Sequence, residues 1–155
     1  MSERAANGDY ADMLRALNEA GAEYLVVGAH ALGAHGYARS TGDIDLWLRP
    51  TAENAQRVLA ALRQFGAPTF GTTADELCAP GIILQLGLAP SRIDLLTSID
   101  GVSFDEAWPL RVEATIEGVK TFVLGLETLR RNKLATGRLK DVADAEVIAK
   151  LLERK

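Results

Sequence analysis

The sequence predicts one mixed α/β domain, and three of its features support that fold class. Its 155 residues suit a single compact core, which we expect to span residues 1–155. Apolar residues at spacings of three and four, typical of helices, alternate with short apolar runs that are typical of buried strands. Later segments alternate apolar and polar residues around turns, as hairpins do. Together these features predict a mixed central sheet flanked by helices.

The first part of the chain alternates helices with strands. Tyr10, Met13 and Leu17 lie on one face of an expected helix, which Gly21 can end. Thr51 follows the second expected strand and has a side-chain oxygen suited to capping the next helix. The expected elements are helices at 9–20, 29–35 and 52 to about 65, and strands at 24–27 and 44–48.

The rest of the chain predicts two hairpins and a helical end. Residues 87–91 suit a turn between two strands, and Glu117-Gly118 suits the turn of a second hairpin. Gly137 separates two C-terminal helices, which we expect to pack on the domain at about 126–153. The expected elements are a helical turn near 74–77 within a loop at 66–80, strands at 82–88, 92–96, 111–116 and 119–124, a helical turn at 104–108, and helices near 126–136 and 140–153.

Composition narrows the classes of protein to consider. Cys78 is the only cysteine, which indicates a reducing compartment, and we expect a cytoplasmic protein. The polar N-terminus lacks the apolar stretch of a signal peptide, and no apolar run reaches the roughly 20 residues that span a bilayer, so we expect no membrane partner. The net charge of −4 argues against a general nucleic-acid coat protein.

Two carboxylates share one face of the second expected strand. Strand side chains alternate between faces, so Asp43 and Asp45 point to one side while Ile44 and Leu46 point to the other. Neighbouring carboxylates repel each other, and a bridging cation removes that repulsion. Because hard oxygen ligands favour Mg²⁺ or Mn²⁺, the pair predicts a metal site. Taken alone, the pair fits equally well with strand-end acids that face water.

A third carboxylate has the same local setting. Asp94 stands between aliphatic residues in the strand expected at 92–96, where an acid is costly unless it faces a solvated cleft or a metal. If that strand lies beside the strand of Asp43 and Asp45, the three acids converge. Three such carboxylates are able to hold two metal ions for phosphoryl transfer, which makes them candidate catalytic and metal-binding residues.

The three acids belong to a longer pattern of motifs. Gly28 follows the apolar run that begins at Tyr24, Arg39 and Thr41 precede the Asp-x-Asp, and Lys133 opens a late segment that contains Arg138 and Asp141. In this order, across residues 23–148, the motifs resemble the DNA polymerase β-like nucleotidyltransferase superfamily. The closer likeness is to AbiEii-type nucleotidyltransferases, which include toxin components of toxin–antitoxin pairs and many uncharacterised bacterial proteins.

The resemblance implies a fold, a reaction and a set of site residues. It implies the nucleotidyltransferase fold, an NTP substrate, Mg²⁺ or Mn²⁺ at Asp43, Asp45 and Asp94, and an RNA, protein or small-molecule hydroxyl as acceptor. An antitoxin would be the partner. The second turn residue is Ala29 here, where the family usually has Gly or Ser. The implied nucleotide-binding residues are Gly28, Ala29, Arg39, Thr41, Lys133, Lys140 and Asp141.

Residues 128–140 carry five basic side chains and no acid, which is unusual in an acidic chain. Arg130 and Lys133 lie three apart and share a helix face that could contact phosphates. A solvated helix face is the alternative for Arg130 and Arg131, whereas the motif favours a function for Lys133. Asp141 lies where the last helix begins, so it also fits a capping role.

Three functions follow from these residues. The first is a metal-dependent nucleotidyltransferase that moves an NMP from an NTP to a hydroxyl. The second is a catalytically inactive relative that binds a nucleotide or a protein, which Ala29 favours. The third is a toxin acting on RNA, in which the basic segment at 128–140 contacts the nucleic acid.

Overall fold

The computed structural model describes residues 6–37, 42–67, 69, 71–88 and 91–154, with only the backbone at 6–8. Arg39 and Thr41, expected from the resemblance to bind nucleotide, lie outside the described residues. Within the described residues, no helix is long and apolar enough to cross a membrane.

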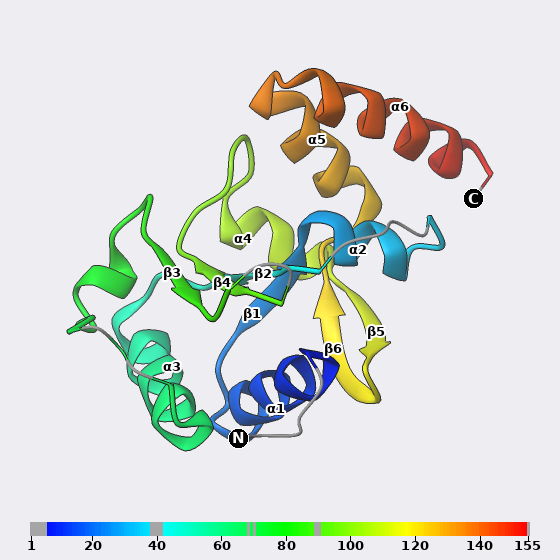
Figure 1. The fold of residues 1–155 in the computed structure, drawn as a ribbon. Helices are drawn as coiled ribbons and strands as arrows, with labels where there is room; N and C mark the ends of the chain where they lie inside the picture. The colour runs from blue at the N-terminus through cyan, green and yellow to red at the C-terminus, as the bar shows by residue number, and fades with distance from the viewer. Residues whose placement is uncertain (1–5, 38–41, 68, 70, 89–90, 155) are drawn as a thin grey trace.

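Six strands form one mixed sheet in the part of the chain that the structure describes (Figure 1). Their order across the sheet is β3-β4-β2-β1-β6-β5, which confirms the mixed central sheet. The central pair β1 and β2 is antiparallel, whereas β2 pairs with β4, and β1 with β6, in parallel. The strands are β1 Tyr24–Val27, β2 Ile44–Leu48, β3 Ile83–Leu86, β4 Ile93–Leu96, β5 Val112–Ile116 and β6 Val119–Val123.

The helices form two groups around the sheet. In Figure 1, α1 and α3 lie beside each other at one end of the molecule, and the antiparallel pair α5 and α6 lies at the other. The short α2 leads directly out of β1 and contacts β1, β2 and α5. The helices are α1 Ala6–Glu19, α2 Gly28–Ala34, α3 Ala52–Phe65, α4 Phe104–Ala107, α5 Leu126–Thr136 and α6 Leu139–Glu153, with 3₁₀ turns η1 Glu76–Cys78 and η2 Trp108–Leu110.

The sequence patterns place most of these elements correctly. The Thr51 hydroxyl accepts a hydrogen bond from the Asn54 backbone N–H, as an N-cap does. Glu117 and Gly118 both have positive φ and turn the β5–β6 hairpin as expected. The strand expected at 82–88 is shorter, because the chain turns at Gly87, where φ is +82°. The other boundaries either coincide or differ by at most three residues, since element ends depend on local capping and hydrogen bonding.

One hydrophobic core joins the sheet to α1 and α3. The α1 face anticipated from the helical spacing is buried, with Met13, Leu14 and Leu17 fully inside. Leu25, Leu46 and other aliphatic residues of the central strands complete the core. Each fully buried side chain of this size stabilises the fold by about 1.5–3 kcal/mol. The central strands are therefore held rigidly at the point where β1 and β2 carry the site residues.

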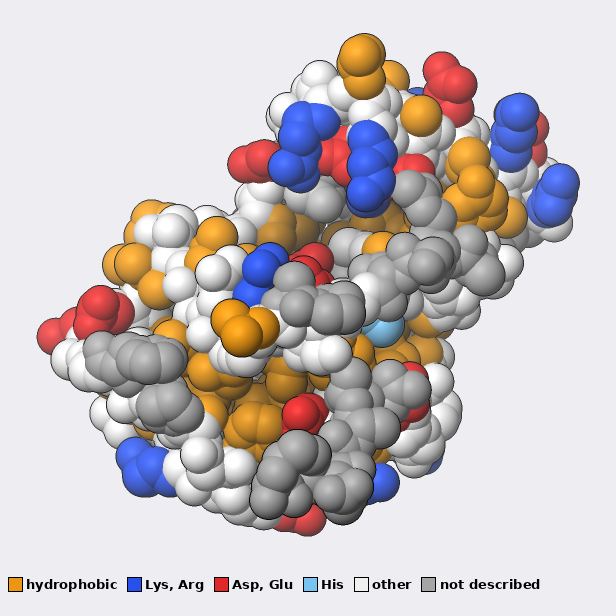
Figure 2. All heavy atoms as spheres, viewed as in Figure 1, with side chains coloured by type: hydrophobic (Ala, Val, Ile, Leu, Met, Phe, Trp, Pro, Cys, Tyr) orange, Lys and Arg blue, Asp and Glu red, His pale blue; other side chains and the backbone are white. Residues whose placement is uncertain are grey.

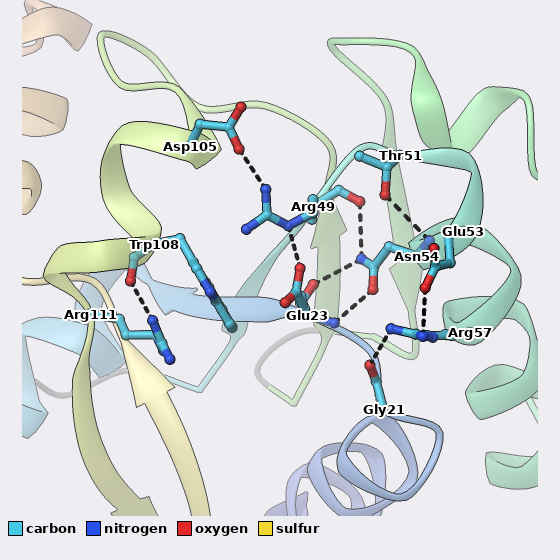
Figure 3. A network of polar contacts seen from close by, with 10 residues as sticks. All are labelled: Gly21, Glu23, Arg49, Thr51, Glu53, Asn54, Arg57, Asp105, Trp108 and Arg111. Carbon is cyan, nitrogen blue, oxygen red and sulfur yellow. Dashed lines mark hydrogen bonds and ion pairs between the residues drawn. The ribbon is translucent and has the colours of Figure 1, made fainter.

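A polar network closes the end of β2 that is remote from Asp43 and Asp45 (Figure 3). The Arg49 side chain pairs with Glu23 and, at 2.6 Å, with Asp105. The Asn54 side-chain amide donates to the backbone carbonyls of Glu23 and Arg49 at 2.9 and 3.0 Å. The Arg49 guanidinium lies over the Phe104 and Trp108 rings, 4.6 and 5.5 Å from their centroids. These contacts fix where β1 begins and β2 ends.

Candidate functional site

A cavity of about 580 Å³ lies between the sheet and the α5–α6 pair. Figure 2 shows the corresponding hollow between the body of the molecule and the helical pair, with Lys and Arg side chains gathered over the helical side. One wall belongs to the sheet and α2, and the other belongs to α5, α6 and the segment after β4. The lining residues that carry charge or line the α2 turn are Gly28, Ala29, Asp43, Asp45, Arg92, Asp100, Lys133, Arg138, Lys140, Asp141 and Asp144.

The strand register brings the three expected carboxylates together. In the parallel pair of β2 and β4, Asp45 lies directly opposite Asp94. Directly paired residues of neighbouring strands point to the same face, and Asp43 lies two residues before Asp45 on that face. The Asp94 side chain is about 10% exposed, whereas that of Asp43 is about 28% exposed, so the group runs from the sheet interior to the cavity.

Asp45 is the carboxylate of this group whose charged form is least stabilised by its surroundings. Burial, followed by the charge and hydrogen bonding of the neighbouring Asp94 and the charge of Asp43, raises the pKa of its carboxyl to about 6. Arg92 acts in the opposite direction but with a smaller effect. Asp45 is thus the member of the trio that a further positive charge would stabilise most.

Gly28 makes room for that carboxylate. Its φ is +71°, a conformation that side chains with a Cβ rarely adopt. A Cβ placed there would lie 2.6 Å from Oδ2 of Asp45, which no real contact permits. Among the described non-glycine residues, only Glu117 has a positive φ, so Ala29 sits in α2 without that strain. The requirement for glycine geometry therefore falls on Gly28, and Ala29 meets the backbone geometry of the turn.

Arg92 occupies the space between the carboxylates, and the sequence patterns did not single it out. Its Nε lies 2.7 Å from Oδ1 of Asp94, and its Nη2 lies 3.2 Å from Oδ2. The same Nη2 lies 3.3 Å from Oδ2 of Asp43, and the Arg92 backbone N–H donates to Oδ1 of Asp43 at 3.0 Å. The signal was present, because Arg92 and Asp94 are two residues apart and strand alternation puts them on one side.

The opposite wall holds a second charged cluster. The buried Lys133 Nζ lies 3.2 Å from Oδ1 of Asp141 and 3.2 Å from Oδ2 of Asp144. Thr136 and Arg138 also donate to Oδ2 of Asp141, at 2.7 and 2.8 Å. Burial alone would raise the pKa of Asp141, but these hydrogen bonds from Thr136, Lys133 and Arg138 outweigh it and lower the pKa.

This cluster shows that Asp141 does not have the capping role considered above, and the basic residues of 128–140 differ in whether they line the cavity. Asp141 does not cap α6, because Arg138 is the N-cap residue and Asp141 lies inside the first turn, bound to Lys133. Lys133 and Lys140 line the cavity. Arg131 points elsewhere, donating to the Gly101 carbonyl at 3.1 Å and pairing with Glu106 at 3.2 Å.

The donor chemistry suits a hard divalent cation, but the arrangement is closed by Arg92. Asp43, Asp45 and Asp94 supply oxygen ligands on one face, and Asp45 lacks a full counter-charge. Across the described residues, however, no group of three His, Cys, Asp or Glu side chains is arranged to hold a metal ion. All four carboxylate oxygens of Asp43 and Asp94 face Arg92 instead. The chemistry of the three acids suits a cation, but the described arrangement pairs two of them with Arg92.

Comparison with solved structures supports the fold. The chain is similar to the crystal structure of the TM1012 protein from Thermotoga maritima, provisionally described as a nucleotidyltransferase. The similarity covers 92% of this chain and 89% of that chain, with a TM-score of 0.52 and 17% sequence identity. No protein-family model matches the chain, and no curated protein matches it. The chain therefore has the nucleotidyltransferase fold that the motifs predicted.

Proposed function

We propose that the protein is a metal-dependent nucleotidyltransferase that moves an NMP from an NTP to a hydroxyl acceptor. The observation that carries this proposal is the direct pairing of Asp45 with Asp94 across parallel strands, beside Asp43 and under the Gly28 turn. The likeness to a structure described as a nucleotidyltransferase supports the same reaction. Asp43 and Asp45 line the cavity, and its opposite wall supplies the cationic side chains of Lys133, Arg138 and Lys140, alongside Asp100, Asp141 and Asp144.

The reaction that fits these residues is an in-line displacement at the α-phosphorus. The acceptor oxygen forms the new bond to phosphorus, the bond to the β-phosphate oxygen breaks, and pyrophosphate leaves. A divalent cation bound by Asp43, Asp45 and Asp94 would neutralise the triphosphate and increase the acidity of the acceptor hydroxyl. We assign Asp94, which lies directly opposite Asp45 in the sheet, to help remove the proton of the acceptor hydroxyl.

The chain's other residues orient the triphosphate. Gly28 and Ala29 line the cavity in the first turn of α2, where backbone N–H groups have no partner within the helix. Lys140 is exposed on the facing wall, and Lys133 is fixed there by Asp141 and Asp144. Such positioning and charge neutralisation supply most of the catalysis in phosphoryl transfer.

We further propose RNA as the acceptor, in a protein of the AbiEii type that works as the toxin of a toxin–antitoxin pair. The support is that Arg138 and Lys140 are exposed and line the cavity beside the turn between α5 and α6, and that Arg130 is exposed further back along α5. RNA bound there would lose affinity steeply with salt, because phosphate contacts release counterions.

The test is radiolabel transfer from each α-labelled NTP to total RNA and to total protein, with pyrophosphate release measured in parallel. Wild type should label one acceptor class, and Asp45→Ala should reduce labelling by at least about 100-fold. Asp75→Ala is the matched control, since Asp75 is exposed, does not line the cavity and removes the same charge. Nucleotide binding by wild type without any transfer would refute catalysis and identify a binding protein.

A further inference from the structure

The Arg92 guanidinium occupies the place where a bridging cation would be expected. It contacts Asp94 through two nitrogens and Asp43 through one. The contact to Asp94 uses both carboxylate oxygens, which is the bidentate geometry that makes arginine–carboxylate pairs strong. Arg92 also lines the cavity, and its side chain is about 30% exposed, so it is not locked in by packing.

A cation entering this group must compete with Arg92. Both oxygens of Asp94 accept hydrogen bonds from the guanidinium, and Oδ2 of Asp43 lies 3.3 Å from it, so a metal ion bound by these oxygens would have to displace the guanidinium. A guanidinium left in place would also repel the incoming cation at close range. Among the described residues, the carboxylates do not form a ready three-ligand group while this contact is in place.

We propose that Arg92 is an internal counter-ion that a divalent cation displaces from the acids, and that the released guanidinium then binds the phosphates of the nucleotide. The proposal rests on the nucleotide-binding function of the cavity described above. A planar guanidinium pairs with phosphate in the same bidentate way as with carboxylate, so the anionic substrate offers Arg92 an equivalent partner.

The exchange couples the two ligands. A cation that arrives alone leaves Arg92 without a partner, whereas a nucleotide that arrives alone meets three carboxylates partly covered by a single guanidinium. Each ligand therefore improves the site for the other, and by linkage the coupling is reciprocal. Arg92 accordingly lowers the affinity for a free cation and raises the affinity for the cation–nucleotide pair.

The test is a calorimetric titration of Mn²⁺, in the absence of nucleotide, into wild type, Arg92→Gln and Arg92→Lys. We expect Arg92→Gln to bind Mn²⁺ about tenfold more tightly than wild type. Arg92→Lys should have an intermediate affinity, because lysine keeps the positive charge but lacks the bidentate guanidinium. Arg131→Gln is the matched control, since it removes one positive charge from a residue that does not line the cavity, and its affinity should equal that of wild type.

Thermal unfolding gives a second readout that needs no catalysis. In EDTA, Arg92→Gln should unfold at a lower temperature than wild type, because three carboxylates then lack a counter-ion, and Mn²⁺ should restore its stability more than it raises that of wild type. Equal or weaker Mn²⁺ affinity in Arg92→Gln, or no larger stabilisation by Mn²⁺, would overturn the proposal. Tighter Mn²⁺ binding without any nucleotidyl transfer would instead refute the proposed reaction and leave the role of Arg92 intact.

Discussion

Arg49 and Arg92 sit at opposite ends of the same region of the sheet, and each pairs with two carboxylates. Arg49 follows β2 and pairs with Glu23 and Asp105, whereas Arg92 precedes β4 and pairs with Asp43 and Asp94. Counting ion pairs would treat the two arginines alike. Their surroundings are what differ.

Aromatic rings cover Arg49, and a cavity opens beside Arg92. Phe104 and Trp108 lie against the Arg49 guanidinium, as Figure 3 shows for Trp108, and Asn54 donates to the Arg49 backbone carbonyl. The Arg49 side chain is about 19% exposed, and it is not among the residues that line the cavity beside Arg92. Arg92 lines a space of about 580 Å³ whose other wall carries Lys133 and Lys140. We therefore interpret the Arg92 ion pairs, which border a cavity, as a candidate ligand site, and the Arg49 ion pairs, which are stacked on two aromatic rings, as structural.

The largest effect should come from the glycine beside the acids. Gly28→Ala would place a Cβ against Asp45 and force a strained φ, so we expect at least about a 100-fold loss of transfer and a loss of about 3 kcal/mol in unfolding free energy. Gly21→Ala is the control, because φ there is +72° but nothing lies within 4 Å of the added Cβ. It should cost only the strain, about 1–2 kcal/mol, and retain activity. Equal effects of the two changes would show that the contact with Asp45 is unimportant.

The second prediction tests whether Arg49 is purely structural. Arg49→Gln removes two ion pairs and the contacts with two rings, so we expect urea unfolding to show a loss of about 2 kcal/mol. Its Mn²⁺ affinity should match wild type, in contrast to that of Arg92→Gln. A changed Mn²⁺ affinity in Arg49→Gln would contradict the interpretation that Arg49 is purely structural.

The third prediction concerns pH and the Asp45 carboxyl. Its pKa is about 6 in the folded protein and 3.8 in its ordinary environment, so the folded state holds this proton more tightly between those values. Without divalent cations, the stabilising contribution is complete below about pH 4 and is lost as pH rises through 6. Asp45→Asn should therefore be about 1–2 kcal/mol more stable than wild type at pH 8 in EDTA, and indistinguishable near pH 4. Thermal melts at both pH values in EDTA check this, and a constant difference across pH would contradict it.

The sequence by itself determined the elements and the identity of the acids. Asp43 and Asp45 alternate with Ile44 and Leu46, so their shared face follows from strand geometry alone. Thr51 and the Glu117-Gly118 turn are likewise local signals, because capping and turn geometry depend on neighbours within a few residues. The nucleotidyltransferase fold was predictable because these local signals occur in a recognisable order along most of the chain.

Only the tertiary structure decided how the acids are matched with cations. That β2 and β4 pair in parallel with Asp45 opposite Asp94 depends on a contact between segments 49 residues apart in register, which no local spacing specifies. The two partners of Arg92 and the placement of Lys133 between Asp141 and Asp144 depend on the same packing. The sequence gives the charge of each side chain, but which opposite charge lies within a few ångströms of it depends on how the chain folds.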